Sequence, residues 1–274
     1  MGGVSDSEEA SVVETMVKQY GKLMNIEPID CQKEGGPVYS LEGLNLSHSY
    51  SQVIISIRKF LKGNTRARRF LLLLSGPPGT GKTEFVRHIA QSSDRRLIVK
   101  RASDLLGPYV GMTEKNTAKA FEEAREQEAI LFIDEADSFL QDRSSAQRNW
   151  EVTQVNEFLV QMENFEGLLF MSTNFEDSLD IAAARRFDLR LNFGPILPEK
   201  VLDTLRRTLP NVEWEGQAQI TSRLSKMNDL RFGDIRNVAS RMDLGLCEND
   251  MGTILKELER ELESRHHHAK IGFS

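Results

Sequence analysis

The segment "FLLLLSGPPGTGKTEFVRHIAQ", residues 70–91, limits the folds open to this chain more than any other part of the sequence. An apolar run of strand length comes first, a glycine-rich turn follows, and a helical stretch comes directly after the turn. Four more short apolar runs, "RLIVKRAS", "AILFID", "GLLFMST" and "LRLNF", alternate with helical stretches further along the chain. This alternation predicts an α/β domain with a parallel sheet covered by helices on both faces.

The sequence pattern divides the chain into three parts. Residues 1–36 contain an amphipathic helical stretch, "SVVETMVKQYGKLM", and a linker with several Gly and Pro. The α/β pattern fills residues 37–197, and residues 198–274 show helical periodicity without a further strand. We therefore expect an N-terminal helix and linker, an α/β domain and a small all-helical domain.

Charge and hydropathy argue against several classes of protein. The 35 Lys and Arg against 41 Asp and Glu give a net charge of -6, so nucleic acid is an unexpected partner of the whole molecule. No apolar run approaches the ~20 residues that cross a bilayer, and the N-terminus lacks a signal-peptide pattern. Cys31 and Cys247 lie far apart and in no metal-ligand spacing, which is typical of a reduced compartment. We expect a cytoplasmic protein without a membrane partner.

The stretch "RKFLKGNTRARR", residues 58–69, is a local exception to the acidic average. Such a run is either the solvated face of a helix and loop or a contact surface for nucleic acid. Both interpretations stay open at the level of sequence.

The glycine-rich turn "GPPGTGKT" has the properties of a polyphosphate site. Backbone N–H groups and the positive end of the following helix would point at one place, where a Cβ would block the close approach of the backbone. Lys82 would reach the β and γ phosphates, and the Thr83 hydroxyl would ligate Mg²⁺. The residues of this predicted nucleotide site are Gly76, Pro77, Pro78, Gly79, Thr80, Gly81, Lys82 and Thr83.

Two of the other apolar runs end in polar residues that would lie at the same edge of the sheet. "ILFIDEAD" places Asp134 and Glu135 at the end of one strand, and "GLLFMSTN" places Asn174 at the end of another. Open α/β sheets bind their ligands at this edge. Asp134 would hold Mg²⁺, Glu135 would polarise an attacking water, and Asn174 would hydrogen-bond the water and the γ phosphate. The alternative is that these residues cap a helix or form a turn.

Together these motifs resemble the AAA+ ATPases, and within them the AAA proteins that remodel or thread other proteins. The resemblance covers about residues 40–250 and rests on "GPPGTGKT", "ILFIDEADSFL", "MSTN" and "LDIAAARRFD" in family order. It implies a five-stranded parallel sheet in the order 5-1-4-3-2, flanked by helices and followed by a helical lid. It also implies binding of ATP and Mg²⁺ in a ring of identical subunits, usually a hexamer, with nucleotide bound between neighbours.

The resemblance assigns roles to three arginines. Arg185 and Arg186 are similar to the arginine fingers that the family projects into a neighbouring subunit, where the guanidinium fork matches the γ phosphate oxygens. The Arg-Arg-Phe order leaves open which of the two is primary. Arg236 in "GDIRNV" resembles the sensor 2 arginine, which reaches the nucleotide from the lid. Ordinary surface arginines are the alternative in each case.

The segment "GPYVG", residues 107–111, occupies the place of the family's aromatic-aliphatic-glycine loop, which faces the channel of the ring. Tyr109 and Val110 would then contact a polypeptide substrate without dependence on its sequence. Gly107 and Gly111 would let the loop move. The alternative is that Tyr109 packs on its own subunit.

The leading hypothesis is therefore an ATP-dependent protein-remodelling ATPase that acts on a polypeptide, directly or through an adaptor. A nucleic-acid loader that uses residues 58–69 is one alternative, and a nucleotide-switched assembly chaperone is another.

Overall fold

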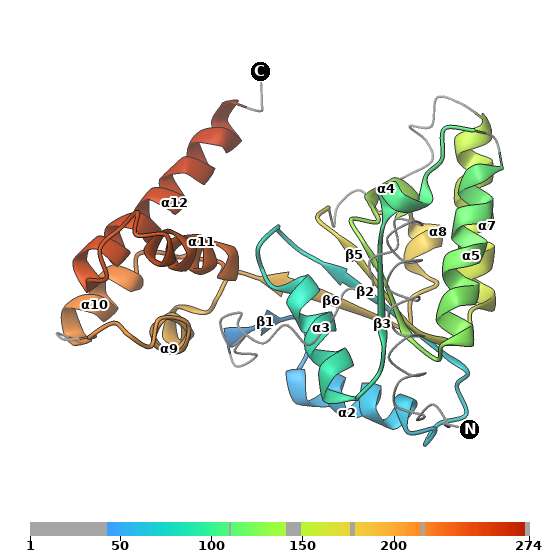
Figure 1. The fold of residues 1–274 in the computed structure, drawn as a ribbon, viewed down its shortest axis with the longest axis horizontal. Coiled ribbons are helices and arrows are strands. Elements are labelled where there is room, and N and C mark those ends of the chain that lie inside the picture. The colour runs from blue at the N-terminus through green and yellow to red at the C-terminus, as the bar shows by residue number, and fades with distance from the viewer. Residues whose placement is uncertain (1–42, 110, 141–148, 176–178, 215–216, 272–274) are drawn as a thin grey trace, which may run out of the picture. The chain divides into compact units, whose positions relative to one another are not determined.

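The computed structural model describes residues 43–109, 111–140, 149–175, 179–214 and 217–271 (Figure 1). The chain divides at Gly36 into two units, and all of the described residues belong to the second unit, Pro37–Ser274. The helix predicted within residues 1–36 lies outside the described residues, as does Val110.

A mixed sheet forms the centre of the α/β part, and its strand order is β1-β6-β2-β5-β4-β3. The antiparallel strand is β1 (Asn45–Leu46), which pairs with β6 at one edge of the sheet. The parallel strands are β2 (Arg69–Ser75), β3 (Leu97–Arg101), β4 (Ile130–Asp134), β5 (Gly167–Thr173) and β6 (Leu189–Gly194). Numbered among themselves, these five have the predicted order 5-1-4-3-2.

Within the described residues the sheet has six strands rather than the expected five, because the chain pairs antiparallel with β6 just before α2 (Tyr50–Leu61). Only Asn45 and Leu46 take part, through Gly194 and Phe193. A pairing of two residues is too short to produce the period-two apolar pattern by which strands are found in a sequence.

Helices cover both faces of the sheet (Figure 1). Alternate residues of β2 point to opposite faces, so Leu72 and Leu74 belong to one apolar cluster, and Leu71 and Leu73 to the other. The first cluster lies against α2 (Tyr50–Leu61) and α3 (Lys82–Ser92), and the second against α5 (Met112–Glu126) and α7 (Asn149–Asn164). Shorter helices complete this part: α4 (Ala102–Leu105), α6 (Asp137–Leu140) and α8 (Ile181–Ala184).

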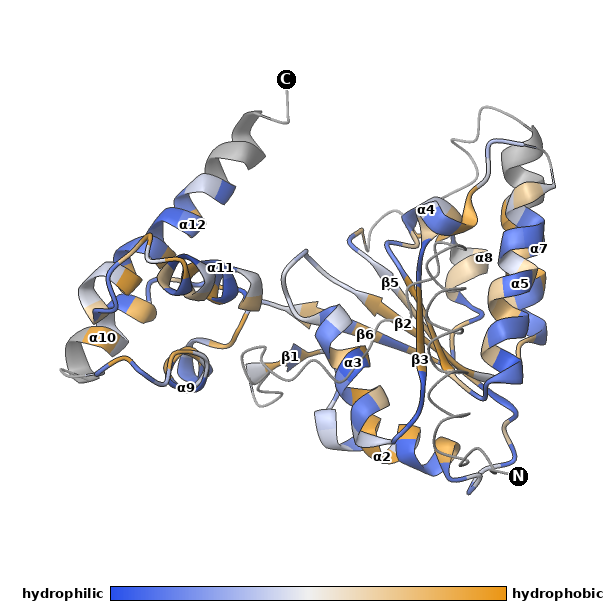
Figure 2. Ribbon diagram, viewed as in Figure 1, coloured by the Kyte–Doolittle hydropathy of each residue, from blue (hydrophilic) through white to orange (hydrophobic). Residues whose placement is uncertain are grey.

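Both faces of the strands are buried, which explains why their sequences read as continuous apolar runs. Leu71, Leu72, Leu73 and Leu74 are each at most 1% exposed. Figure 2 shows the hydrophobic colour concentrated on the strands, whereas the helices carry both hydrophobic and hydrophilic residues. The sequence-based prediction of a parallel sheet covered on both faces is confirmed.

The C-terminal helices enclose an apolar core of their own. Val201, Leu205, Ile220, Val238 and Leu258 are buried in it. The helices are α9 (Pro198–Thr208), α10 (Gln217–Leu224), α11 (Phe232–Asp243) and α12 (Met251–Ile271). We call this helical part the lid. Across the described ranges, none of the helices combines the length and the hydropathy that a membrane span requires.

Candidate nucleotide-binding site

The turn between β2 and α3, residues 76–81, has a backbone that requires glycine. Gly76, Gly79 and Gly81 have φ angles of 133°, 80° and 99°, which side chains other than glycine rarely adopt. A Cβ on Gly76 would also lie 2.2 Å from the carbonyl oxygen of Phe193 in β6. The turn ends at Lys82, the first residue of α3, so the free N–H groups of that helix lie beside the turn.

Lys82 connects the turn to a neighbouring strand. Its Nζ donates hydrogen bonds to the carbonyl oxygens of Gly76 at 2.5 Å and Pro77 at 3.0 Å, and to Asn174 Oδ1 at 3.0 Å. Burial lowers the pKa of Lys82 to about 8, although Asp134 and Asp137 act in the opposite direction. A bound polyphosphate would favour the charged amine again. The structure thus brings together two residues that the sequence assigned to one site.

Thr83 and Asp134 lie side by side. The Thr83 Oγ1 donates to Asp134 Oδ2 at 3.1 Å, and the Ser172 hydroxyl of β5 donates to the other carboxylate oxygen. A hydroxyl and a carboxylate are the oxygen donors that Mg²⁺ prefers, so this pair fits the ion that the motifs imply. Ser172 was not singled out in the sequence, and it orients the carboxylate.

Glu135 adopts an unusual backbone conformation at the end of β4. Its φ is 55°, and its N–H donates to Asp134 Oδ1 at 3.1 Å and to Ser172 Oγ at 3.0 Å. A non-glycine residue in this region of φ is strained unless its surroundings hold it. The side chain itself is exposed, so it can contact a water molecule.

Asp137 is a residue of this site that the sequence analysis missed. Its Oδ1 accepts hydrogen bonds from the Thr173 hydroxyl and, at 3.3 Å, from the Asn174 N–H. Asp137 therefore fixes the end of β5 that carries the Asn174 side chain. It is the third acidic residue of the motif "ILFIDEAD", of which only Asp134 and Glu135 were assigned a role from the sequence.

The two candidate arginine fingers differ in their contacts. Arg186 is held within its own chain, because its Nε donates to Glu163 Oε1 at 2.5 Å and its Nη1 to the Ala182 carbonyl at 2.6 Å. The Arg185 side chain is exposed. The bonds described for Arg186 lead to α7 and α8, not to the Lys82 and Asp134 cluster.

The lid contacts the glycine-rich turn near the start of α11. The Gly233 N–H donates to the Gly79 carbonyl at 2.9 Å, and Arg231 Nη1 donates to the Pro78 carbonyl at 3.3 Å. Arg236, which the sequence proposed for this role, is exposed one turn further along α11. It lies three residues after Gly233, which places both on a similar face of the helix. No sequence signal singled out Arg231.

Tyr109 lies between α4 and α5, and its side chain is 74% exposed. Gly111 ends this segment with a φ of 83° and caps α5. Gly107 also meets a packing requirement, because a Cβ there would lie 2.5 Å from the Met112 side chain. Its N–H also donates to Thr113 Oγ1 at 3.0 Å, so this glycine packs against α5.

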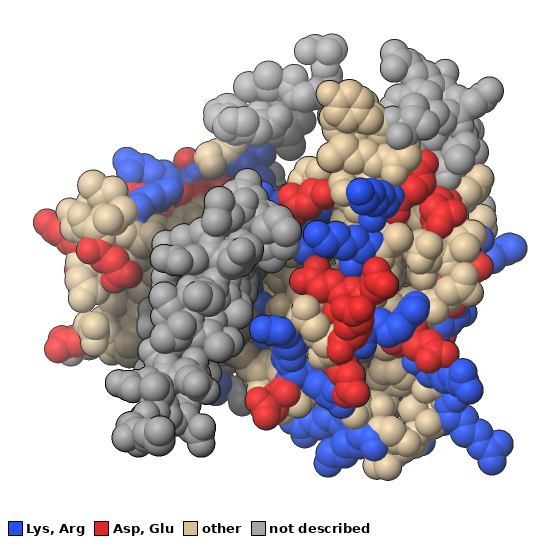
Figure 3. Space-filling view, turned by 45° about the vertical axis from the view of Figure 1, so that its right-hand side comes forward, with Lys and Arg blue, Asp and Glu red and all other residues tan. Residues whose placement is uncertain are grey.

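The basic stretch 58–69 is partly used for contacts within the chain. Arg68 pairs with Glu166 at 3.1 Å, and Arg69 donates to the Glu163 carbonyl. Figure 3 shows Lys and Arg side chains lying among Asp and Glu side chains over much of one face of the molecule. This arrangement is typical of a solvated surface.

Comparisons with known proteins match the part of the chain that carries these motifs. Residues 72–195 match the family model described as "ATPase family associated with various cellular activities (AAA)". Residues 72–195 thus carry an AAA domain, as the motifs predicted.

The similar proteins include Spastin of Drosophila melanogaster, which is 37% identical over 147 residues, 51% of this chain and 19% of that protein. Spastin of Drosophila mojavensis is 37% identical over 155 residues, 54% of this chain and 20% of that protein. The chain thus spans about a fifth of the length of these relatives. The fold is similar to the crystal structure of the FIGL-1 AAA domain in complex with ADP, with a TM-score of 0.60, 23% identity, and 83% and 85% of the two chains covered.

Proposed function

We propose that this protein hydrolyses ATP at the interfaces of a ring of identical subunits and uses the reaction to remodel polypeptides. The observation that carries the proposal is the pair of bonds at the sheet edge, from Lys82 to Asn174 and from Thr83 to Asp134. These bonds join the glycine-rich turn to two neighbouring strands. The four side chains would bind and orient one triphosphate.

ATP would occupy the turn through the backbone N–H groups of residues 79–83 and through Lys82. The Lys82 amine would exchange its bonds with the Gly76 and Pro77 carbonyls for bonds to phosphate oxygens. Thr83 and Asp134 would hold Mg²⁺, which neutralises charge on the β and γ phosphates when it is bound. The Thr83 hydroxyl and the Asp134 carboxylate already lie 3.1 Å apart, which places both within reach of one ion.

Glu135 would orient and polarise the water that attacks the γ phosphate. Its side chain is exposed, it follows Asp134 directly in the chain, and its backbone N–H is held by Asp134 and Ser172. Asn174 would hydrogen-bond the γ phosphate, and Asp137 would keep Asn174 in place. Removal of a catalytic base or water-positioning group of this kind lowers the rate about 10²- to 10⁴-fold.

Charge on the transferring phosphoryl group would be stabilised by an arginine of the neighbouring subunit. An arginine finger contributes about 10³ to 10⁵ in rate, so an isolated subunit would be nearly inactive. Arg185 suits this role because its guanidinium is exposed. Arg186, which is bonded to Glu163, would support the loop that carries Arg185. A hexamer is the ring that the family favours.

The polypeptide substrate would be contacted by Tyr109, whose ring is exposed. An aromatic ring gives a large apolar contact without directional bonds, so it can bind many different sequences. Val110 would add an aliphatic contact. Movement of the lid on hydrolysis would carry this segment along the substrate, and an adaptor would deliver the substrate where direct binding is weak.

The proposal is tested by mixing two inactive variants of the protein. Arg185→Ala keeps the nucleotide site but loses the exposed guanidinium, whereas Lys82→Ala loses nucleotide binding but keeps Arg185. Each variant alone should be inactive, and the mixture should regain ATPase activity, because some interfaces then contain one intact site and one intact arginine.

The matched control mixes Lys82→Ala with Glu135→Gln, whose defects lie on the same side of the interface, so activity should stay absent. Specific activity of the wild-type protein should also rise with its concentration. Full activity in a demonstrated monomer, or no recovery in the first mixture, would remove the role of the neighbouring arginine.

A further inference from the structure

Four charged residues of the lid form a closed set of ion pairs next to the glycine-rich turn. Arg231, just before α11, binds Asp229 with Nη2 at 2.8 Å and with Nε at 3.2 Å. Arg265 of α12 also binds Asp229, with Nη1 at 2.8 Å to the carboxylate and 2.6 Å to the carbonyl. The second nitrogen of Arg265 binds Asp234. We call this set the lid ion cluster.

The cluster is partly shielded from solvent. The Asp234 side chain is 8% exposed and that of Arg231 is 13% exposed. Asp234 Oδ2 accepts the Arg231 N–H at 2.8 Å, so this carboxylate caps α11 while its other oxygen binds Arg265. Burial raises the pKa of Asp229, but the hydrogen bonds and charges of Arg265 and Arg231 lower it overall. Each charge of the cluster is thus compensated by another.

One edge of the cluster contacts the turn at two successive peptide groups. Arg231 binds the Pro78 carbonyl, and Gly233 binds the Gly79 carbonyl. A Cβ on Gly233 would lie 3.1 Å from the Gly79 Cα, so the two chains approach as closely as glycine allows. The charge of Arg231 also acts on Lys82, whose pKa it lowers.

These contacts determine where two N–H groups of the turn point. In a trans peptide the C=O and the N–H point in opposite directions. The Pro78 carbonyl belongs to the same peptide plane as the Gly79 N–H, and the Gly79 carbonyl to the same plane as the Thr80 N–H. Holding the two carbonyls toward the lid therefore directs both N–H groups to the opposite side, which is where a phosphate would bind.

We propose that Arg231 is a positioning residue for phosphate binding, and that Arg265 of α12 keeps Arg231 in place through Asp229. The inference rests on the proposed nucleotide site and adds a second, indirect route from the lid to the phosphates, separate from Arg236. Because Arg265 lies near the end of the last helix, displacement of α12 would loosen the turn. Nucleotide affinity then depends on a helix that does not touch the nucleotide.

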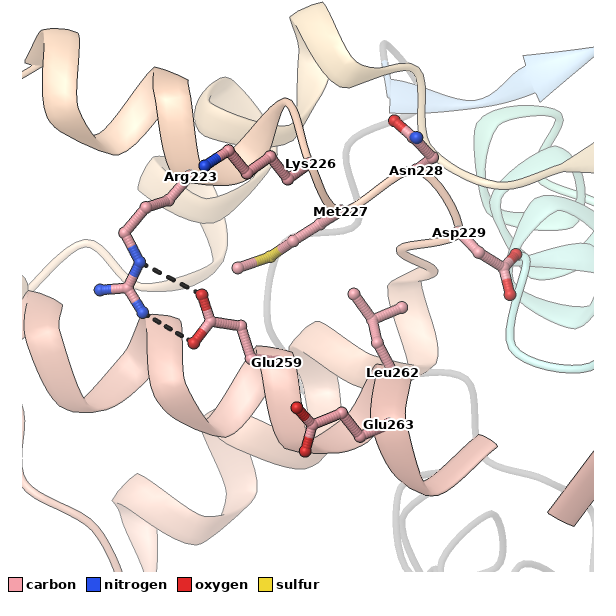
Figure 4. A pocket seen from close by; sticks show the side chains of 8 residues that line it. All are labelled: Arg223, Lys226, Met227, Asn228, Asp229, Glu259, Leu262 and Glu263. Atoms are coloured by element: carbon pink, nitrogen blue, oxygen red, sulfur yellow. Dashed lines mark hydrogen bonds and ion pairs between the residues drawn. The ribbon is translucent and has the colours of Figure 1, made fainter. Parts of the chain in front are cut away.

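The lid offers a matched control for the loss of an arginine. The lid has a cavity of about 670 Å³. Figure 4 shows Asp229 on one side of this cavity and the Arg223–Glu259 pair on the other. Arg223 binds Glu259 through two bonds, of 2.8 Å and 3.2 Å, and joins α10 to α12. It therefore resembles Arg265 in geometry, but its described bonds lead away from the turn.

The test measures the binding of a fluorescent ADP analogue, mant-ADP, to the full chain. Arg231→Gln should weaken binding about tenfold, because a charged hydrogen bond that orders the turn is lost. Arg265→Gln should weaken it about threefold, and Arg223→Gln should leave it unchanged. The double variant Arg231→Gln/Arg265→Gln should bind no more weakly than Arg231→Gln, since Arg265 acts through Arg231.

Unchanged affinity of Arg231→Gln, or additive losses in the double variant, would overturn the proposal. Should Arg231→Gln fail to fold, Arg231→Lys keeps the charge but loses the fork, and it must also weaken binding. Binding of ADP requires neither a ring nor hydrolysis, so these results are separate from the subunit-mixing experiment. Wild-type protein that does not bind mant-ADP would instead contradict the proposed nucleotide site.

Discussion

Two regions of the α/β domain differ in the hydrogen bonds of their side chains: the nucleotide-facing edge of the sheet, and the exposed residues Tyr109 and Arg185. At the sheet edge, Lys82 at the start of α3 donates a hydrogen bond to Asn174, which follows β5, and Thr83 donates one to Asp134 of β4. By contrast, Tyr109 and Arg185 are exposed. Lys82, Thr83, Asp134 and Asn174 of the first region are thus bonded within one chain, whereas the second region offers groups that a further chain could use.

This difference follows from the cost of burying charge. An amine and a carboxylate at a half-buried sheet edge must be paired, or the loss of hydration would destabilise the fold. A guanidinium or an aromatic ring at the surface has no such requirement, and its contacts form on association. We therefore expect substitutions at the sheet edge to abolish nucleotide binding and hydrolysis. Substitutions of the exposed residues Tyr109 and Arg185 should impair only the steps that need a second chain.

The largest effect should come from Lys82→Ala, because the amine would make charged hydrogen bonds to two phosphates. Loss of two such bonds corresponds to about 10² to 10⁴ in affinity. Titration with a fluorescent ATP analogue measures the change. Lys119→Ala, which removes an exposed lysine of α5, is the control and should bind like the wild type. ATP binding by Lys82→Ala within tenfold of the wild type would refute the proposed role of the turn.

A smaller and more selective effect is expected for Tyr109→Ala. Because the ring is exposed, its removal should leave the melting temperature unchanged. The basal ATPase rate should stay within about twofold of the wild type. Unfolding of a fluorescent protein with an unstructured tail should stop, since the apolar contact with the tail is lost. Tyr109→Phe keeps the ring and should retain this activity. A drop of several degrees in melting temperature would mean that Tyr109 packs on its own subunit.

The parallel sheet and the phosphate turn could be predicted because local patterns determine both. Leu71 to Leu74 are apolar on both faces of β2, and Gly76, Gly79 and Gly81 mark a backbone that only glycine adopts readily. The polar ends of β4 and β5 follow from the same reasoning, since parallel strands end at one edge.

The features that were not predicted depend on contacts between residues that are far apart in the sequence. Arg231 meets Pro78 across 153 positions of sequence, and nothing in the residues around either one indicates the contact. The difference between Arg185 and Arg186 depends on Glu163, which precedes Arg186 by 23 positions. Asp137 was missed for another reason, because its partner atoms are a hydroxyl and an N–H of β5 rather than a ligand.

The smallest expected effect depends on pH. It concerns whether paired charged side chains stabilise the lid, as they do the nucleotide-facing edge of the sheet. The pKa of Asp229 is below its usual 3.8, because the hydrogen bonds and charges of Arg265 and Arg231 outweigh the effect of burial. A carboxyl group with a lowered pKa stabilises the fold above its unfolded pKa, and this contribution is lost as pH falls through the folded value. Asp229→Asn should therefore melt slightly below the wild type at pH 7 and pH 5, by about 2 °C, and the difference should close below about pH 4. Asp234 also contacts Arg265, so the comparison uses the difference between two variants at each pH rather than one acid transition. Glu263→Gln removes a carboxylate from the wall of the same cavity and is the control, which should follow the wild type at every pH. If the difference between Asp229→Asn and the wild type is the same at pH 7 and pH 3.5, the Asp229 charge does not stabilise the lid.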